Sequence, residues 1–126
     1  MSGKILVVDD REPLRRRIRL LLEEHGLEIC GEAVNGREAI DKVRELSPDL
    51  AILNISMPVM SGLEALPEIL RSRPKIKVVI FTLDESEELK KHLFGLGAHG
   101  YVPKSAPPEE LVAEVKRLLK QAATAD

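Results

Sequence analysis

Residues 51–62 read AILNISMPVMSG, and this stretch passes from a buried strand through a polar turn into the start of a helix. Residues 50–53 are all apolar, which is typical of a strand covered on both faces of a parallel sheet. Ser61-Gly-Leu-Glu64 follows, and a serine three residues before a glutamate is a capping box that marks a helix start. The stretch predicts a strand–loop–helix unit with Asn54 at the first exposed position of the loop.

The same alternation continues along the whole chain. Short apolar runs also occur at 5–8 and 76–81, and weaker ones at 28–34 and 100–102. Apolar residues with helical spacing lie between and after these runs, at 14–22, 39–43, 66–70, 89–93 and 111–119. Five strands alternating with five helices predict an α/β, doubly wound parallel sheet with strand order 2-1-3-4-5.

Prolines and capping residues place the ends of the expected helices. Pro13 and Pro108 suit first turns, and the segments 35–38 and 84–87 are expected to cap the second and fourth helices. Pro67 falls inside the third helix, where a proline is expected to cause strain.

Length and composition limit the class of protein. The chain has 126 residues, of which 44% are hydrophobic and 32% charged, which fits a single domain. We expect a domain at 1–121, with 122–126 as a tail or the start of a linker. A net charge of -2 and 2% aromatic residues argue against nucleic-acid binding. With no transmembrane or signal segment and one cysteine, a soluble cytoplasmic protein without membrane contact is expected.

Polar residues follow four of the expected strands. Asp9 and Asp10 follow the first, Asn54 the third, Thr82 the fourth and Lys104 the fifth. In a sheet of this order, ligands bind beyond the carboxyl ends of strands 1 and 3, so the five side chains should meet there. Adjacent carboxylates repel each other, and a hard cation such as Mg²⁺ would relieve that repulsion.

These residues carry a resemblance to a known family. The segments KILVVDD, NGREAIDKV, SPDLAILNISMPVMSGLEAL, VVIFT, GAHGYVPKS and PPEELVAEVKRLL are similar to receiver domains of bacterial two-component response regulators, especially those that precede helix-turn-helix output domains. The resemblance covers nearly all of the chain. It implies a flavodoxin-like receiver fold and a role in phosphorelay signal transduction, as a signalling module rather than an enzyme.

The resemblance also implies a role for each site residue. Asp9 and Asp10 match the acidic pair that holds Mg²⁺, and the backbone carbonyl of Ser56 matches a further metal ligand. Thr82 matches the switch hydroxyl, and Lys104 matches the lysine that contacts the phosphoryl group.

The resemblance extends to partners. Tyr101 matches the aromatic residue that reports activation on the face formed by helix 4, strand 5 and helix 5, through which a homodimer is expected. A sensor histidine kinase and a DNA-binding output domain outside this chain are the other expected partners.

Asn54 stands where the family has its phosphoacceptor aspartate. A receiver carboxylate attacks a phosphohistidine and becomes an acyl phosphate, whereas an amide is a poor nucleophile. Asn54 can still offer an oxygen to a metal, but the acidic residues fall from three to two. We therefore expect no phosphorylation at residue 54, weakened Mg²⁺ binding, and Lys104 paired with Asp9 or Asp10.

Three explanations of Asn54 remain. The residue is natural, which makes the chain a phosphate-independent pseudo-receiver and protein-interaction module; or it is engineered; or it deamidates to aspartate. Deamidation is least favoured because the bulky Ile55 slows backbone attack. Leu83, beside the expected phosphoryl site, would narrow access for a donor and favours the natural explanation.

Other functions fit the sequence less well. The arginines of 11–20 are expected on a solvated helix face, with kinase docking as the alternative. His25, His92 and His99 lack ligand spacing. Phosphatases with an aspartate nucleophile need Asp-x-Asp, which is absent from VVDDRE, and the acidic DDREP would repel the phosphate of a flavin.

Overall fold

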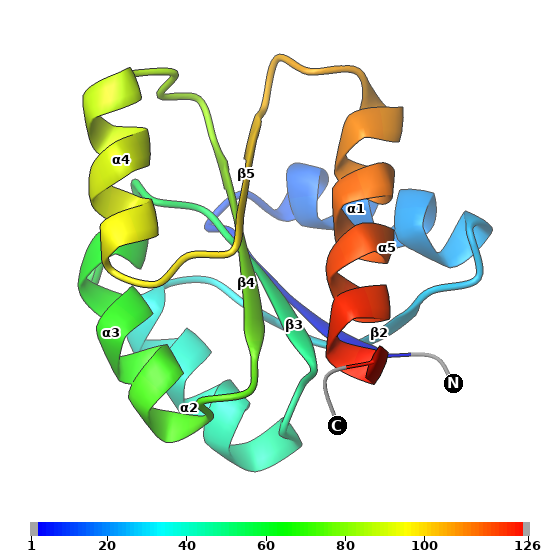
Figure 1. Cartoon of the computed structure of the whole chain (residues 1–126), viewed down its shortest axis with the longest axis horizontal. Coiled ribbons are helices and arrows are strands. Elements are labelled where there is room, and N and C mark those ends of the chain that lie inside the picture. The colour runs from blue at the N-terminus through cyan, green and yellow to red at the C-terminus, as the bar shows by residue number, and fades with distance from the viewer. Residues whose placement is uncertain (1–2, 125–126) are drawn as a thin grey trace.

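The computed structural model describes residues 3–124, which form a five-stranded parallel sheet between two layers of helices (Figure 1). The strands are β1 (Lys4–Val8), β2 (Glu28–Ala33), β3 (Leu50–Leu53), β4 (Lys77–Thr82) and β5 (Gly100–Pro103). The helices are α1 (Glu12–Glu24), α2 (Gly36–Leu46), α3 (Gly62–Ser72), α4 (Glu87–Gly95) and α5 (Pro108–Thr124). The strand order is β2-β1-β3-β4-β5, which confirms the predicted topology.

The alternation of side chains along the central strands creates two cores. Leu6 and Leu53 face α2, α3 and α4, whereas Ile5 and Ile52 face α1 and α5. All four are at most 1% exposed, so these strands are buried on both faces, as their unbroken apolar runs predict. β1 leads to α1 on one face of the sheet, and β3 leads to α3 on the other face. The two loops that follow these neighbouring strands therefore run in opposite directions away from the sheet.

The helix ends agree with most of the expected signals. Ser61 and Glu64 form the complete capping box at α3, and Asn35 accepts from the Glu38 amide at α2. The Glu38 carboxylate, however, bonds the Val34 amide rather than that of Asn35.

The structure also agrees with the expectations about helices α4 and α3. Ser86, within the expected segment 84–87, caps α4, and the Asp84 carboxylate accepts from the Ser86 amide. Helix α3 continues through Pro67 to Ser72.

The last helix is longer than expected. α5 continues to Thr124, so residues 122–124 of the expected tail are helical, and 125–126 lie outside the described residues. Between residues 3 and 124, none of the helices combines the length and the apolar character needed to cross a membrane.

Candidate functional site

The predicted site residues gather at the carboxyl ends of four strands. Asp9 and Asp10 directly follow β1, Asn54 follows β3, Thr82 is the last residue of β4, and Lys104 follows β5. Asp9, Asn54 and Thr82 are at most 5% exposed, although all three are polar. Burial of polar groups is tolerated only when they are hydrogen-bonded, so their partners define what the site can do.

Asp9 is the centre of a dense set of contacts. Lys104 Nζ lies 2.8 Å from Asp9 Oδ2, with the two side chains 9% and 2% exposed. The Arg11 amide donates to Asp9 Oδ1 at 2.9 Å, and Arg15 Nη1 donates to the Asp9 carbonyl at 2.7 Å. The structure therefore resolves the choice of Lys104 partner in favour of Asp9, and both oxygens of this carboxylate already accept a hydrogen bond.

Asn54 joins Asp10 to the loop after β3. Its backbone amide donates to the Val8 carbonyl at 3.0 Å, which continues the β1–β3 pairing by one residue. Its side-chain nitrogen Nδ2 donates to Ser56 O at 2.9 Å and to Asp10 Oδ1 at 3.3 Å. Asp10 and Ser56 are exposed, so the buried Asn54 side chain lies beneath two exposed oxygen-bearing residues.

A glycine allows the loop after β3 to turn back tightly. The Gly62 amide donates to the Ile55 carbonyl at 2.8 Å, and a Cβ atom at position 62 would overlap the backbone carbonyl oxygen of Asn54. Only glycine fits this close approach. The same residue therefore opens helix α3 and holds Asn54 at the end of β3.

The oxygens of the site are of the kind that Mg²⁺ prefers. The Asp9 and Asp10 carboxylates and the Ser56 carbonyl are hard donors, so they fit the ion chemically. Asn54 adds an amide rather than a carboxylate, and within residues 3–124 no group of three or more His, Cys, Asp or Glu side chains is arranged for a metal. The metal roles of Asp9, Asp10, Asn54 and Ser56 stay predictions.

Thr82 and Leu83 lie at the end of β4. The Thr82 hydroxyl accepts a long hydrogen bond, 3.4 Å, from the Asp84 amide, and the Thr82 carbonyl accepts from the Lys104 amide at 2.8 Å. The latter bond places Thr82 beside Lys104. Leu83 is 63% exposed, so most of its side chain is in solvent, and its effect on access stays a prediction.

Tyr101 is held against the loop between β4 and α4. Its hydroxyl donates to the Asp84 carbonyl, and Lys90 Nζ lies 5.5 Å from the ring centroid, within the range of a cation–π interaction. Burial, followed by the carboxylates of Asp84, Glu85 and Glu87, raises the pKa of the Tyr101 hydroxyl. These contacts could not be predicted from residue types, because they depend on how the loop folds over β5.

The arginines of α1 differ from the expected solvated face. Arg15 and Arg19 both bind Glu32 of β2, each with a nitrogen–oxygen distance of 2.9 Å, and the Arg15 side chain is only 11% exposed. Burial raises the pKa of the Glu32 carboxyl, but the hydrogen bonds from Arg15 and Arg19 outweigh it and hold that pKa below its ordinary value. The expectation was wrong for Arg15 because β2 places a carboxylate beneath it. It holds for Arg16, which is 70% exposed.

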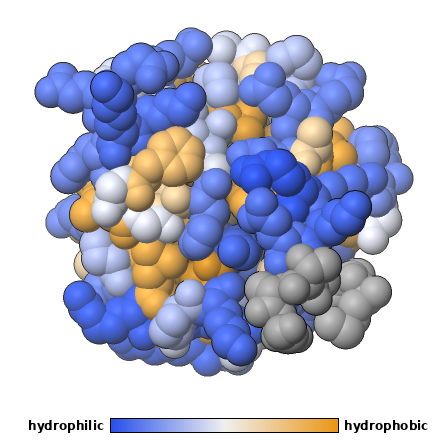
Figure 2. Space-filling view, viewed as in Figure 1, coloured by the Kyte–Doolittle hydropathy of each residue, from blue (hydrophilic) through white to orange (hydrophobic). Residues whose placement is uncertain are grey.

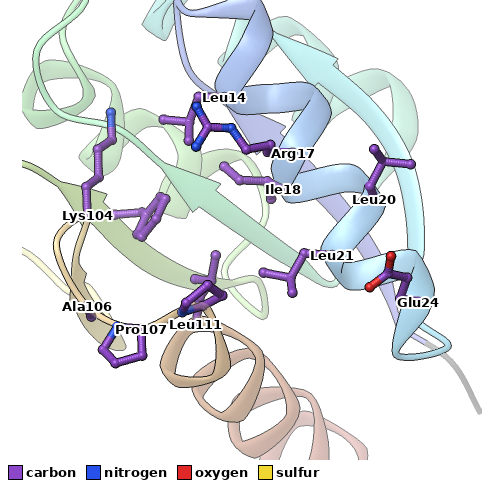
Figure 3. A pocket seen from close by; sticks show the side chains of 12 residues that line it. Leu14, Arg17, Ile18, Leu20, Leu21, Glu24, Lys104, Ala106, Pro107 and Leu111 are labelled. Atoms are coloured by element: carbon purple, nitrogen blue, oxygen red, sulfur yellow. The ribbon is translucent and has the colours of Figure 1, made fainter.

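A groove lies between α1 and α5 and reaches the site lysine (Figure 3). Its volume is about 340 Å³. Its lining is mainly apolar and includes Leu14, Ile18, Leu21 and Leu111. Arg17, Glu24 and Lys104 add charge. A partner in this groove would contact the lysine that binds Asp9.

Comparisons with known proteins identify the family. Residues 5–116 match the family model of the response regulator receiver domain. The response regulator GacA of Pseudomonas aeruginosa is 40% identical over 116 residues, which cover 91% of this chain and 54% of that protein. The chain thus belongs to the response regulator receiver family of two-component signalling, and it spans about half the length of the curated relatives that head the comparison.

Solved structures agree with this assignment. A LuxR-family response regulator from Aurantimonas sp. SI85-9A1 has a TM-score of 0.91 and 31% identity, covering 95% of this chain and 86% of that one. A CheX–CheY–BeF3–Mg complex from Borrelia burgdorferi has a TM-score of 0.89 and 24% identity, covering 93% and 89%, and shows the shared fold. The family and the fold predicted from the sequence are confirmed.

Proposed function

We propose that this chain is a receiver module that is not phosphorylated at residue 54 and that acts by binding other proteins. The observation that carries the proposal is the amide at Asn54, bonded to Asp10 and to the Ser56 carbonyl. Phosphoryl transfer would require a carboxylate oxygen to attack the phosphorus of a phosphohistidine, which forms an acyl phosphate and releases the histidine. The Asn54 nitrogen has its lone pair delocalised and donates both observed hydrogen bonds, so it offers no nucleophile.

Mg²⁺ binding should also be weaker than in a receiver with three acids. Asp9, Asp10 and the Ser56 carbonyl would hold the ion, which when bound would neutralise the two carboxylates. One carboxylate fewer lowers the attraction for a divalent cation. In place of the ion, Lys104 supplies a positive charge to Asp9 at 2.8 Å. The module acts as a binding protein rather than an enzyme.

The surface offers places for the proposed partners. A sensor histidine kinase would dock along the apolar groove between α1 and α5, where Arg17 lies free to meet an acidic side chain. A homodimer would use the face of α4, β5 and α5, which lies towards the viewer in Figure 1, and Figure 2 shows hydrophobic side chains gathered on it beside hydrophilic ones. A DNA-binding output domain outside this chain and a cytoplasmic location complete the proposal.

An intact-mass experiment tests the phosphorylation claim. The protein and its Asn54→Asp variant are incubated with Mg²⁺ and acetyl phosphate, and Asn54→Ala serves as the control without either an acid or an amide. We expect a gain of one phosphoryl group in Asn54→Asp alone. Fragment masses that place a stable phosphoryl group on Asn54 of the unaltered protein would refute the proposal.

The same experiment separates the natural explanation of Asn54 from the engineered one. If Asn54→Asp is phosphorylated, the remaining pocket is competent and one residue disables it, as in an engineered or recent block. If Asn54→Asp stays unmodified, the pocket has diverged further and the pseudo-receiver is favoured. Leu83→Ala in the Asn54→Asp background then tests whether Leu83 restricts the donor.

A further inference from the structure

The Asn54 amide group lies between the oxygens that would otherwise face a cation. Its nitrogen donates to Ser56 O at 2.9 Å and to Asp10 Oδ1 at 3.3 Å. Asn54 is 5% exposed, so its donor nitrogen is shielded from water, although Asp10 and Ser56 are exposed. One amide nitrogen therefore donates to both of these oxygens.

The orientation of the amide follows from its neighbours. Turning it over would place its carbonyl oxygen 2.9 Å from Ser56 O and 3.3 Å from Asp10 Oδ1, where oxygens would repel each other. An amide has a donor end and an acceptor end, and only the donor end suits this position. To offer its oxygen to a metal, Asn54 would have to break both hydrogen bonds.

The Asp9 carboxylate likewise accepts hydrogen bonds from groups of this chain. Asp9 Oδ2 accepts from Lys104, and Asp9 Oδ1 accepts from the Arg11 amide. Among the described residues, no buried side-chain nitrogen or oxygen lacks a hydrogen-bond partner. Donors from this chain therefore reach both oxygens of Asp9 and one oxygen of Asp10.

We propose that the Asn54 amide is an internal substitute for the metal ion, which holds the Asp10 carboxylate and the Ser56 loop in place without a cation. This inference rests on the proposed function and adds a second reason for weak Mg²⁺ binding. Loss of a carboxylate lowers the attraction for the ion, and the amide must additionally be displaced before the ion can enter.

Asn54→Ala separates these two reasons. Alanine leaves the number of carboxylates unchanged but removes the amide that fills the site. If only charge matters, Asn54→Ala binds Mg²⁺ no better than the unaltered protein, since it also loses an oxygen that could act as a ligand. If the amide blocks the ion, Asn54→Ala binds Mg²⁺ about tenfold more tightly, because two hydrogen bonds no longer oppose binding.

The experiment is a Mg²⁺ titration with two readouts. Calorimetry measures the affinity, and nuclear magnetic resonance spectra report the backbone amide signals of Asp10 and Ser56. Asn54→Ala should bind about tenfold more tightly than the unaltered protein. Asn35→Ala, which removes a capping amide at α2, is the matched control and should leave Mg²⁺ affinity unchanged. Equal or weaker binding by Asn54→Ala than by the unaltered protein overturns the proposal.

A measurement on the unaltered protein does not depend on how any variant folds. The side-chain NH₂ protons of Asn54 should exchange slowly with solvent without Mg²⁺, because both bonds are in a 5% exposed site. Exchange as fast as in an exposed asparagine overturns the proposal. Phosphorylation of the unaltered protein at Asn54 would refute the proposed function but would leave the ratio of Mg²⁺ affinities as a separate result.

Discussion

At the scale of single residues, Val59 adopts a backbone conformation that is sterically unfavourable for valine. It is 83% exposed, and its φ of 68° lies in the left-handed region, which a β-branched residue rarely adopts. We expect Val59→Gly to raise the free energy of unfolding by about 1 kcal/mol, because glycine removes the steric strain and loses little packing. Urea denaturation at constant pH measures the change.

The matched variant for this prediction is Val59→Ala. Alanine removes the branched side chain but keeps a Cβ atom, so the left-handed conformation remains strained. Its stability should therefore lie closer to that of the unaltered protein. A Val59→Gly variant that is less stable than Val59→Ala would show that the strain is smaller than the conformational entropy of glycine.

At the scale of elements, His99 joins the loop before β5 to β4. Its Nδ1 accepts from the Val78 amide at 3.0 Å, and its own amide donates to the Val78 carbonyl at 2.9 Å. Burial, and then the charge of Lys77, lowers the pKa of the His99 imidazole. The ring is half-buried, and its neutral form stabilises the end of the sheet.

The pKa of His99 has a consequence for stability. In the unfolded chain the imidazole takes up a proton near pH 6.5, whereas in the folded chain it does so at lower pH. The unfolded state binds more protons between these values, so stability is complete above about pH 6.5 and falls as the pH drops towards the folded pKa. Urea midpoints at pH 7.5 and 5.5 should show this decrease.

A variant assigns the effect to His99. Asparagine in His99→Asn offers an uncharged acceptor to the Val78 amide and does not titrate. The decrease between pH 7.5 and 5.5 should therefore be smaller in His99→Asn. An unchanged decrease would assign the effect to other groups.

At the scale of the whole molecule, two cores share one sheet. Leu53 belongs to the core under α2, α3 and α4, and Ile52 belongs to the core under α1 and α5. We expect Leu53→Ala and Ile52→Ala each to lower the free energy of unfolding by about 2–5 kcal/mol, because each creates a cavity in a closely packed interior. Both should preserve a single unfolding transition.

Two optical probes check this expectation. Far-ultraviolet circular dichroism reports all the helices, and the fluorescence of Tyr101, the single tyrosine, reports the side of α4. In Ile52→Ala, a loss of helical circular dichroism before the Tyr101 signal changes would contradict a single cooperative unit. Coincident transitions support it.

Most of the fold could be predicted because it depends on periodic burial. The unbroken run at Leu50–Leu53 and the capping box at Ser61 are local signals, and right-handed crossovers leave few arrangements for five such units. The start of α4 was placed less well, since several acidic and hydroxyl residues near Ser86 could serve as its cap. Such a choice depends on the loop conformation rather than on residue type.

The features of the site also fall into those that follow from the sequence and those that follow from the tertiary structure. The sequence by itself determined that Asp9, Asp10, Asn54, Thr82 and Lys104 lie at the ends of strands of one parallel sheet, and that position 54 carries an amide. These are matters of residue identity and order. The pairing of Lys104 with Asp9, the contact of Arg15 with Glu32, and the direction of the Asn54 amide were decided by the tertiary structure. The physical reason is that hydrogen bonds depend on distance and direction, which only the folded chain fixes.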